Sequence, residues 1–306
     1  MITVIGSCNM DLVVRSANIP RAGETIVGGE FFMTSGGKGA NQAVAAAKLG
    51  AKVHFISRLG NDVFGHRCLD SLKKAGIEQP NIIWSEKDPT GTAMIMLGEN
   101  GDNRIIVSAG ANAGLRPEDI ERVMPAILAS RVIVVQLEIP MLTVEYVIEL
   151  AYRNHIPVIL NPAPAQKLRE DLYHKIDVLT PNETEAELLT GHAIQERHHV
   201  EAAAGRLLAL GVKSVVITLG AKGLYVQSPD CCGFMPCDKV EVVDTTAAGD
   251  AFTGALACQI AEGRTLWEAA DFARHVAALS VTRPGAQSAL PTRQEVDNYL
   301  CSLNKP

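Results

Sequence analysis

The chain has 306 residues, 47% of them hydrophobic and 20% charged, and its 28 basic and 34 acidic side chains give a formal net charge of −6 at pH 7. This composition is ordinary for a globular protein with a sizeable core. Without a basic cluster, an apolar run of roughly 20 residues or a secretory signal, we expect a cytoplasmic protein that binds neither nucleic acid nor membrane.

The first polar cluster follows a buried strand predicted at Thr3–Gly6. Asn9 and Asp11 lie two residues apart, so they can face the same side of the chain. Open α/β sheets bind ligands at the carboxyl ends of their strands. The pair therefore either presents an amide and a carboxylate to a hydroxylated ligand or caps a turn.

Two later segments, 12–35 and 90–107, show strand-like pieces with little helical periodicity. They predict β excursions that pair with each other outside the core, as a lid would. The strand-like pieces are Leu12–Val14, Thr25–Phe32, Ala93–Leu97 and Arg104–Val107, the last two flanking a hairpin turn at Gly98–Gly101.

A glycine-rich segment, 36–43, precedes an alanine-rich helix predicted over Ala43–Leu49. It is not a P-loop, because Gly39 follows Lys38 where Ser or Thr is needed. The first strand–helix junction also lacks G-x-G-x-x-G, which disfavours a dinucleotide enzyme. The glycines allow a ligand to approach the backbone beside Lys38 and Asn41, and a plain turn is the alternative.

Strands and amphipathic helices alternate along the rest of the chain, which predicts a mostly parallel sheet covered on both faces. The expected strands are Val53–Ser57, Val132–Gln136, Pro157–Leu160, Asp177–Thr180 and Ser214–Leu219, and the expected helices are Phe64–Ala75, Val144–Arg153 and Val200–Leu210. Polar residues recur at the strand ends and predict one site along one sheet edge. They are Asn9, Asp11, Glu138, Asn161, Asn182, Glu185 and Thr218.

A short β-like run, Lys239–Val243, leads into a helix predicted over Gly249–Ala261. The small residues before this helix leave backbone amides bare at a helix N-terminus, which favours anions. Asp250 lies in the first turn of the helix. It is therefore either a capping acid or a base that works beside a phosphate.

Residues 36–43 and 244–256 resemble the two signature segments of the ribokinase-type sugar kinases, the phosphofructokinase-B superfamily. The pair is highly specific, further matches follow in order along nearly the whole chain, and Asn9-x-Asp11 with residues 36–43 is most similar to the ribokinases. The resemblance implies that residues 1–306 form a single doubly wound α/β domain. Its lid would be a small β-sheet formed by 12–35 and 90–107.

The resemblance also implies transfer of the ATP γ-phosphoryl group to the O5 hydroxyl of D-ribose. Asp250 would be the base, and the amides of Ala247, Ala248 and Gly249 would form the anion hole. The implied sugar contacts are Asn9, Asp11, Gly37, Lys38, Asn41 and Glu138, with Asp250. The implied ATP contacts are Asn182, Glu185, Thr218, Gly220, Gly223 and Arg274, with Glu185 holding Mg²⁺ through water. An activating K⁺ would be held by Asp244 and by carbonyls of Thr246, Ser280 and Gly285.

Three positions depart from common family residues. Ala247 replaces a frequent Gly but keeps its N–H, Arg274 stands where relatives often have Asn or His near the adenine, and Ala289 stands where Ser can complete the cation site. A deoxyribokinase or a nucleoside kinase for pseudouridine or adenosine can share all of these motifs except those that contact the sugar. A non-catalytic sugar- or nucleotide-binding regulator is a further alternative that a retained Asp250 disfavours.

The lid predicts a homodimer, because a small sheet has an exposed edge and an apolar face that a second copy can cover. The apolar residues expected there are Val14, Ile26, Phe31, Met94 and Ile106. For Asp244, an alternative to cation binding is that its carboxylate only caps the turn through nearby amides.

Overall fold

The computed structural model describes residues 1–306 except 28, 78–79, 99–102 and 304–306. Within this part, a nine-stranded sheet has the order β13-β12-β11-β10-β9-β8-β1-β4-β5. All its pairs are parallel except β11 with β12 and β12 with β13. Its strands are β1 (Ile2–Ile5), β4 (Val53–Gly60), β5 (Asn81–Ser85), β8 (Val132–Gln136), β9 (Val158–Asn161), β10 (Val178–Leu179), β11 (Ser214–Thr218), β12 (Leu224–Gln227) and β13 (Cys232–Met235).

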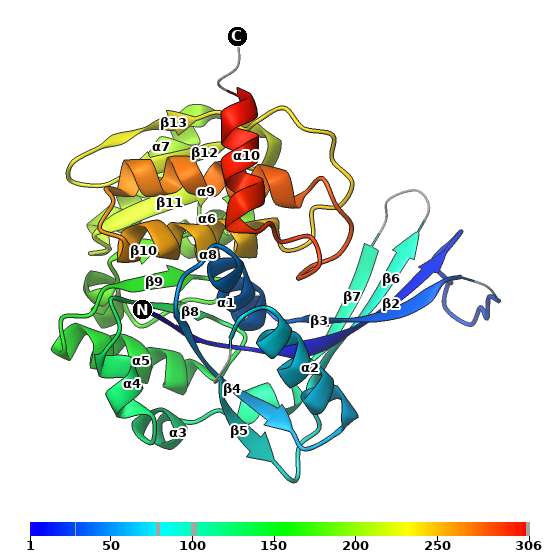
Figure 1. Cartoon of the computed structure of the whole chain (residues 1–306). Helices are drawn as coiled ribbons and strands as arrows, with labels where there is room; N and C mark the ends of the chain where they lie inside the picture. Colours follow the sequence, from blue (N-terminus) through cyan, green and yellow to red (C-terminus); the bar gives the residue numbers. More distant parts are fainter. Residues whose placement is uncertain (28, 78–79, 99–102, 304–306) are drawn as a thin grey trace.

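Helices cover both faces of this sheet (Figure 1). One core joins the sheet to α1 (Lys38–Lys48), α2 (Val63–Lys74), α8 (Ala248–Ala261), α9 (Leu266–Ser280) and α10 (Arg293–Leu303). The other core joins it to α3 (Pro117–Glu121), α4 (Met124–Leu128), α5 (Met141–Arg153), α6 (Glu183–Thr190) and α7 (Arg197–Ala209). Short 3₁₀ turns are η1 (Gly110–Gly114), η2 (Glu170–Lys175) and η3 (Gly220–Lys222).

Burial on both faces explains the sequence of the central strands. Every residue of β8 is buried, and Val132 to Val135 are all β-branched, as expected for a parallel strand covered by helices on both sides. The predicted bounds of this strand agree with the structure. In the described residues, no helix is long and apolar enough to cross a membrane.

A small sheet of order β3-β2-β6-β7 projects from the core (Figure 1). Its strands are β2 (Asn9–Ser16), β3 (Phe31–Gly36), β6 (Gly91–Gly98) and β7 (Asn103–Ser108). Only β2 and β6 pair in parallel. The strand expected at Thr25–Phe32 is wrong, because β3 begins at Phe31 and pairs with β2 as far as Gly36. The predicted hairpin turn falls mostly on 99–102, outside the described residues.

Two further boundaries differ from the sequence-based expectation. Helix α1 begins at Lys38 rather than Ala43, because a glycine in its first turn packs against the residue that follows β1: a Cβ on Gly39 would lie 2.7 Å from Gly6. The described segment Lys239–Val243 contains no strand. At its end, the Val243 N–H donates to the Val281 carbonyl, at 2.8 Å.

Candidate active site

The N-terminus of α8 carries the turn in which a base and an anion hole are expected. Ala247 caps the helix with φ of 61°, a left-handed conformation that is uncommon for a non-glycine residue. The Ala248 N–H donates to the Thr245 carbonyl, at 3.2 Å. In the described part of the chain, no carbonyl accepts from the N–H groups of Gly249 and Asp250. These two amides therefore remain available to an anion.

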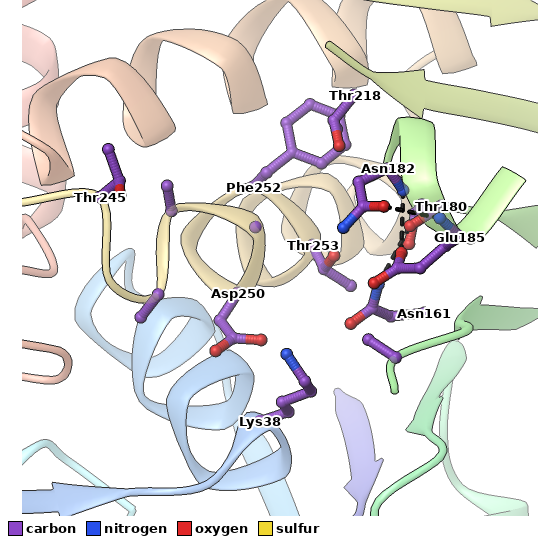
Figure 2. A pocket seen from close by; sticks show the side chains of 14 residues that line it. Lys38, Asn161, Thr180, Asn182, Glu185, Thr218, Thr245, Asp250, Phe252 and Thr253 are labelled. Atoms are coloured by element: carbon purple, nitrogen blue, oxygen red, sulfur yellow. Dashed lines mark hydrogen bonds between the residues drawn. The ribbon is translucent and has the colours of Figure 1, made fainter. Parts of the chain in front are cut away.

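Asp250 extends from this turn with only 6% of its surface exposed. Its Oδ2 accepts a hydrogen bond from Asn41 Nδ2 and its Oδ1 from Gln42 Nε2, both at 2.9 Å. Burial raises the pKa of Asp250, while the charge of Lys38 and the two amide donors oppose that rise. The Lys38 amine points toward the carboxylate across the cavity (Figure 2).

Asp11 lies nearby with 7% of its surface exposed, and burial together with the charges of Glu138 and Asp250 raises its pKa to about 7. Glu138 Oε2 accepts from the Lys38 backbone N–H at 3.0 Å and from the Ser7 hydroxyl. Although burial lowers the pKa of Lys38, the surrounding carboxylates raise it above its ordinary value. The buried Asn41 Oδ1 has no partner among the described residues, so it can accept a ligand hydroxyl.

Asn112, at η1, holds the predicted sugar ligand Asn9. Its Nδ2 donates to Asn9 Oδ1 at 2.7 Å, and its Oδ1 accepts from the Cys8 N–H at 2.9 Å. The amide nitrogen of Asn9 is consequently the group left to face a ligand. Sequence reasoning missed Asn112, because it lies 103 residues from Asn9 and does not directly follow the end of an expected strand.

A cavity of about 220 Å³ joins the turn before α8 to the strand ends. It is lined by Lys38, Asn161, Ala163, Thr180, Asn182, Glu185, Thr218, Thr245, Ala247, Ala248, Gly249, Asp250, Phe252 and Thr253. Asn182 and Glu185 form a capping box at the start of α6, with two backbone-to-side-chain bonds of 2.8 Å (Figure 2). Burial raises the pKa of Glu185, although Lys38 opposes the rise.

A second hollow of about 830 Å³ continues from this cavity and shares Asn182, Thr218, Thr245, Ala248, Gly249 and Phe252 with it. The predicted ATP contacts Gly220, Gly223 and Arg274 line it. The Arg274 guanidinium is bound to Asp238 Oδ1 at 2.6 Å and to Asp271 Oδ1 at 2.7 Å. The carboxylates of Asp238 and Asp271 thus hold the Arg274 side chain at the lining of the second hollow.

Asp244 lies beside the turn before α8. Its Oδ1 accepts from the N–H and hydroxyl of Thr246 at 2.9 and 2.6 Å, and its Oδ2 accepts from the Gly285 N–H at 2.8 Å. Burial opposes ionisation, but these hydrogen bonds lower the pKa of Asp244 below its ordinary value. In the described chain, no donor reaches the carbonyls of Thr246, Ser280 or Gly285, which stay free for a cation.

The model of the pfkB family carbohydrate kinases matches residues 1–293. The chain belongs to the pfkB family of carbohydrate kinases. It is 40% identical over 299 residues to the ribokinase of Haemophilus influenzae, covering 98% of each chain. It is 39% identical over 308 residues to the deoxyribokinase of Salmonella typhi, covering 99% of each. The structure of Arabidopsis thaliana ribokinase complexed with ribose and ATP has a TM-score of 0.90 at 33% identity, covering 98% of each chain.

These findings confirm the resemblance to the pfkB kinases and the predicted fold. They also bear on the arrangement of the site. Residues from both signature segments of this pfkB kinase meet at Asp250, through Asn41 on α1 and the turn before α8. Asn41 bonds to Asp250, the charges of Glu138 and Asp250 act on Asp11, and Asn182 and Glu185 line the same cavity as Asp250 (Figure 2).

Proposed function

We propose that the chain is a ribokinase, which transfers the γ-phosphoryl group of ATP to the O5 hydroxyl of D-ribose. The observation that carries the proposal is the buried Asp250, which lies beside free amides at the N-terminus of α8, bonds to Asn41 and lines the cavity that also holds Asn182 and Glu185. A carboxylate in this position can accept a proton while the amides bind the transferring phosphoryl group. The similarity to named ribokinases supports D-ribose as the sugar.

In the reaction, Asp250 takes the proton from O5 as that oxygen attacks the γ-phosphorus. The bond from the γ-phosphorus to the bridging oxygen breaks, and its electron pair leaves with ADP. The amides of Gly249 and Asp250 and the Lys38 amine lie at the same cavity, where they stabilise charge on the transferring oxygens. Asp11, Asn9 and Asn41 orient the sugar, so that positioning supplies much of the rate.

Asp250→Asn tests the base directly, because Asn keeps the size of the side chain but cannot accept the proton. General base catalysis contributes about 10²–10⁴-fold, so kcat with ribose should fall by that factor. Retention of wild-type kcat would refute the assignment. Complete inactivity of the wild-type chain toward every sugar and nucleoside would instead favour the binding regulator.

Deoxyribose phosphorylation is the second candidate, and the similarity to the deoxyribokinase of Salmonella typhi supports it. The two sugars differ at the 2-hydroxyl, and a buried site built to bind a hydroxyl rejects the analogue that lacks it. Assays with ribose, 2-deoxyribose, adenosine and pseudouridine as acceptors should give the highest kcat/KM for ribose. A higher value for 2-deoxyribose would support the second candidate.

Mg²⁺ is expected to enter with ATP, near Glu185. Glu185 Oε2 is held by the Asn182 N–H, whereas no described residue donates to Oε1. A half-buried carboxylate oxygen facing the cavity fits a hydrated Mg²⁺, which keeps several of its waters in protein sites. The ion would neutralise phosphate charge, and Glu185→Gln should raise the Mg²⁺ concentration needed for half-maximal activity.

K⁺ fits the loop at Asp244, where a carboxylate lies near carbonyls that no described donor occupies. Bound there, the ion would add positive charge beside the catalytic turn. The hydrogen bonds of Asp244 equally suit a turn cap. The two roles are separated by comparing activity in KCl and in NaCl at constant ionic strength. Activity should be higher in KCl than in NaCl, and Asp244→Ala should remove most of that difference. The activation should be weaker than in relatives with Ser at this position, because Ala289 lacks a hydroxyl. Equal activity in both salts would favour the cap.

The lid sheet is proposed to form a homodimer. Strand register places Val14 opposite Phe31, and Met94 opposite Ile106, with all four side chains on one face. Phe31, Met94 and Ile106 are 57%, 55% and 62% exposed, more than expected of large apolar side chains on a monomer surface. Ile26 lies outside the strands. Sedimentation should show a dimer at micromolar concentration, and Ile106→Asp should give a monomer.

A further inference from the structure

Gln42, the fifth residue of α1, is fully buried, and the proposed reaction assigns it no role of its own. Its Nε2 donates to Asp250 Oδ1 at 2.9 Å and to Asn161 Oδ1 at 3.0 Å, and its Oε1 accepts from Gln136 Nε2 at 2.6 Å. Both amide hydrogens and the oxygen are therefore engaged. Because an ionised carboxylate only accepts, this pattern fixes which way the Gln42 amide points.

The partners of Gln42 come from neighbouring strands. Gln136 ends β8, Asn161 ends β9, and the register pairs these two residues directly. Asn161 Nδ2 donates in turn to the Thr180 carbonyl at 3.0 Å, just after β10. Gln42 thus connects the carboxylate on α8 to the carboxyl ends of adjacent strands, close to the cavity where the phosphate is proposed to bind.

Glycines bring α1 near enough for these bonds. A Cβ on Gly254 of α8 would lie 2.6 Å from the Gln42 carbonyl oxygen, so only glycine lets the two helices approach this closely. A Cβ on Gly6 would lie 2.0 Å from Gln136 Oε1, so glycine there also leaves room for the network. Close packing at Gly254 and Gly6 therefore leaves room for the backbone of Gln42 and for the side chain of its partner Gln136.

We propose that Gln42 is a positioning residue, which fixes the orientation of the Asp250 carboxylate and ties it to the strand ends beside the phosphate cavity. The inference rests on the proposed role of Asp250 as base. Asn41 holds the other carboxylate oxygen but also has a free Oδ1 for the sugar. Gln42 has no free polar atom, so it acts through Asp250 rather than on the substrate.

The pH profile gives a readout that a purely structural role would not change. Donors to a carboxylate favour its ionised form, so removal of the Gln42 donor raises the pH at which Asp250 loses its proton. The charged groups that face Asp250 are Lys38 on α1, Asp11 on β2, Glu138 after β8 and Glu185 on α6. Gln42→Met leaves all four in place.

The experiment measures kcat, both KM values and the pH profile for Gln42→Met, with Gln259→Met as the matched control. Gln259 is a buried glutamine on α8 that bonds to Glu262 instead of the network. A lost hydrogen bond to a charged group corresponds to roughly a 10- to 100-fold effect. Gln42→Met should lower kcat by about that factor, change both KM values less than about threefold, and move the acid limb to higher pH.

A wild-type kcat and acid limb in Gln42→Met would overturn the inference, as would a loss confined to KM. If Asp250→Asn also keeps its kcat, the proposed base is wrong; if only Gln42→Met does, Gln42 alone is wrong. If Gln42→Met does not unfold cooperatively, Gln136→Leu is the second variant, because it removes only the hydrogen bond that Gln136 donates to Gln42. It should shift the acid limb in the same direction with a smaller loss of kcat, and an unmoved limb would overturn the inference.

Discussion

Replacement of Asp11 by Asn should weaken sugar binding and stabilise the fold at the same time. The carboxyl is 7% exposed, and burial with two neighbouring carboxylates raises its pKa from 3.8 to about 7. The folded state therefore holds a proton on Asp11 over a pH range in which the unfolded chain has released it. Asn has almost the same shape and carries no charge to bury.

The sign and size of the effect follow from proton linkage. Because the folded pKa is raised, stability falls by about 1.4 kcal/mol per pH unit between pH 3.8 and 7. This loss of stability is absent below pH 3.8 and complete above pH 7, where the raised pKa lowers the free energy of unfolding by about 4 kcal/mol. Asp11→Asn removes this dependence, so its advantage over the wild type should grow by about 3 kcal/mol from pH 5 to pH 8.

Urea unfolding of both proteins at pH 5 and pH 8 without sugar measures this difference, and ribose KM measures the functional loss. Asp119→Asn is the matched control: Asp119 is 4% exposed but lies 3.1 Å from the Arg58 guanidinium, so its replacement should destabilise. An advantage of Asp11→Asn that is equal at the two pH values would refute the reasoning.

Three further predictions concern the backbone and the supports of the site. Ala247→Gly should raise the free energy of unfolding by about 0.5–1 kcal/mol, because φ of 61° strains an alanine; a lower Tm would contradict this. Asn112→Ala should raise ribose KM while ATP KM stays constant, because Asn9 Oδ1 loses its buried donor; titration of both substrates checks it. Gly254→Ala should destabilise by about 1–3 kcal/mol in denaturant unfolding, because its Cβ meets the Gln42 carbonyl; unchanged stability would show that α1 can shift freely.

The sequence alone predicted the layered fold and the edge at which the site lies. Alternating apolar runs and amphipathic stretches are local patterns, so β8 was predicted with its observed bounds and α5 and α7 to within a few residues. Polar residues at strand ends likewise indicated one edge, because parallel strands bring their carboxyl ends together. The start of α1 was missed because glycine has low helix propensity, and packing against β1 overrode it.

Tertiary structure alone decided which side chains touch. Gln42 reaches Asp250 across 208 residues of sequence, and nothing local to either residue indicates the bond. Asn112 orients Asn9, and Arg274 is held by Asp238, for the same reason. Such contacts depend on how closely two elements pack, which Gly254 sets for α1 and α8. The sequence therefore locates the site, while the packing of distant elements determines the orientation of its groups.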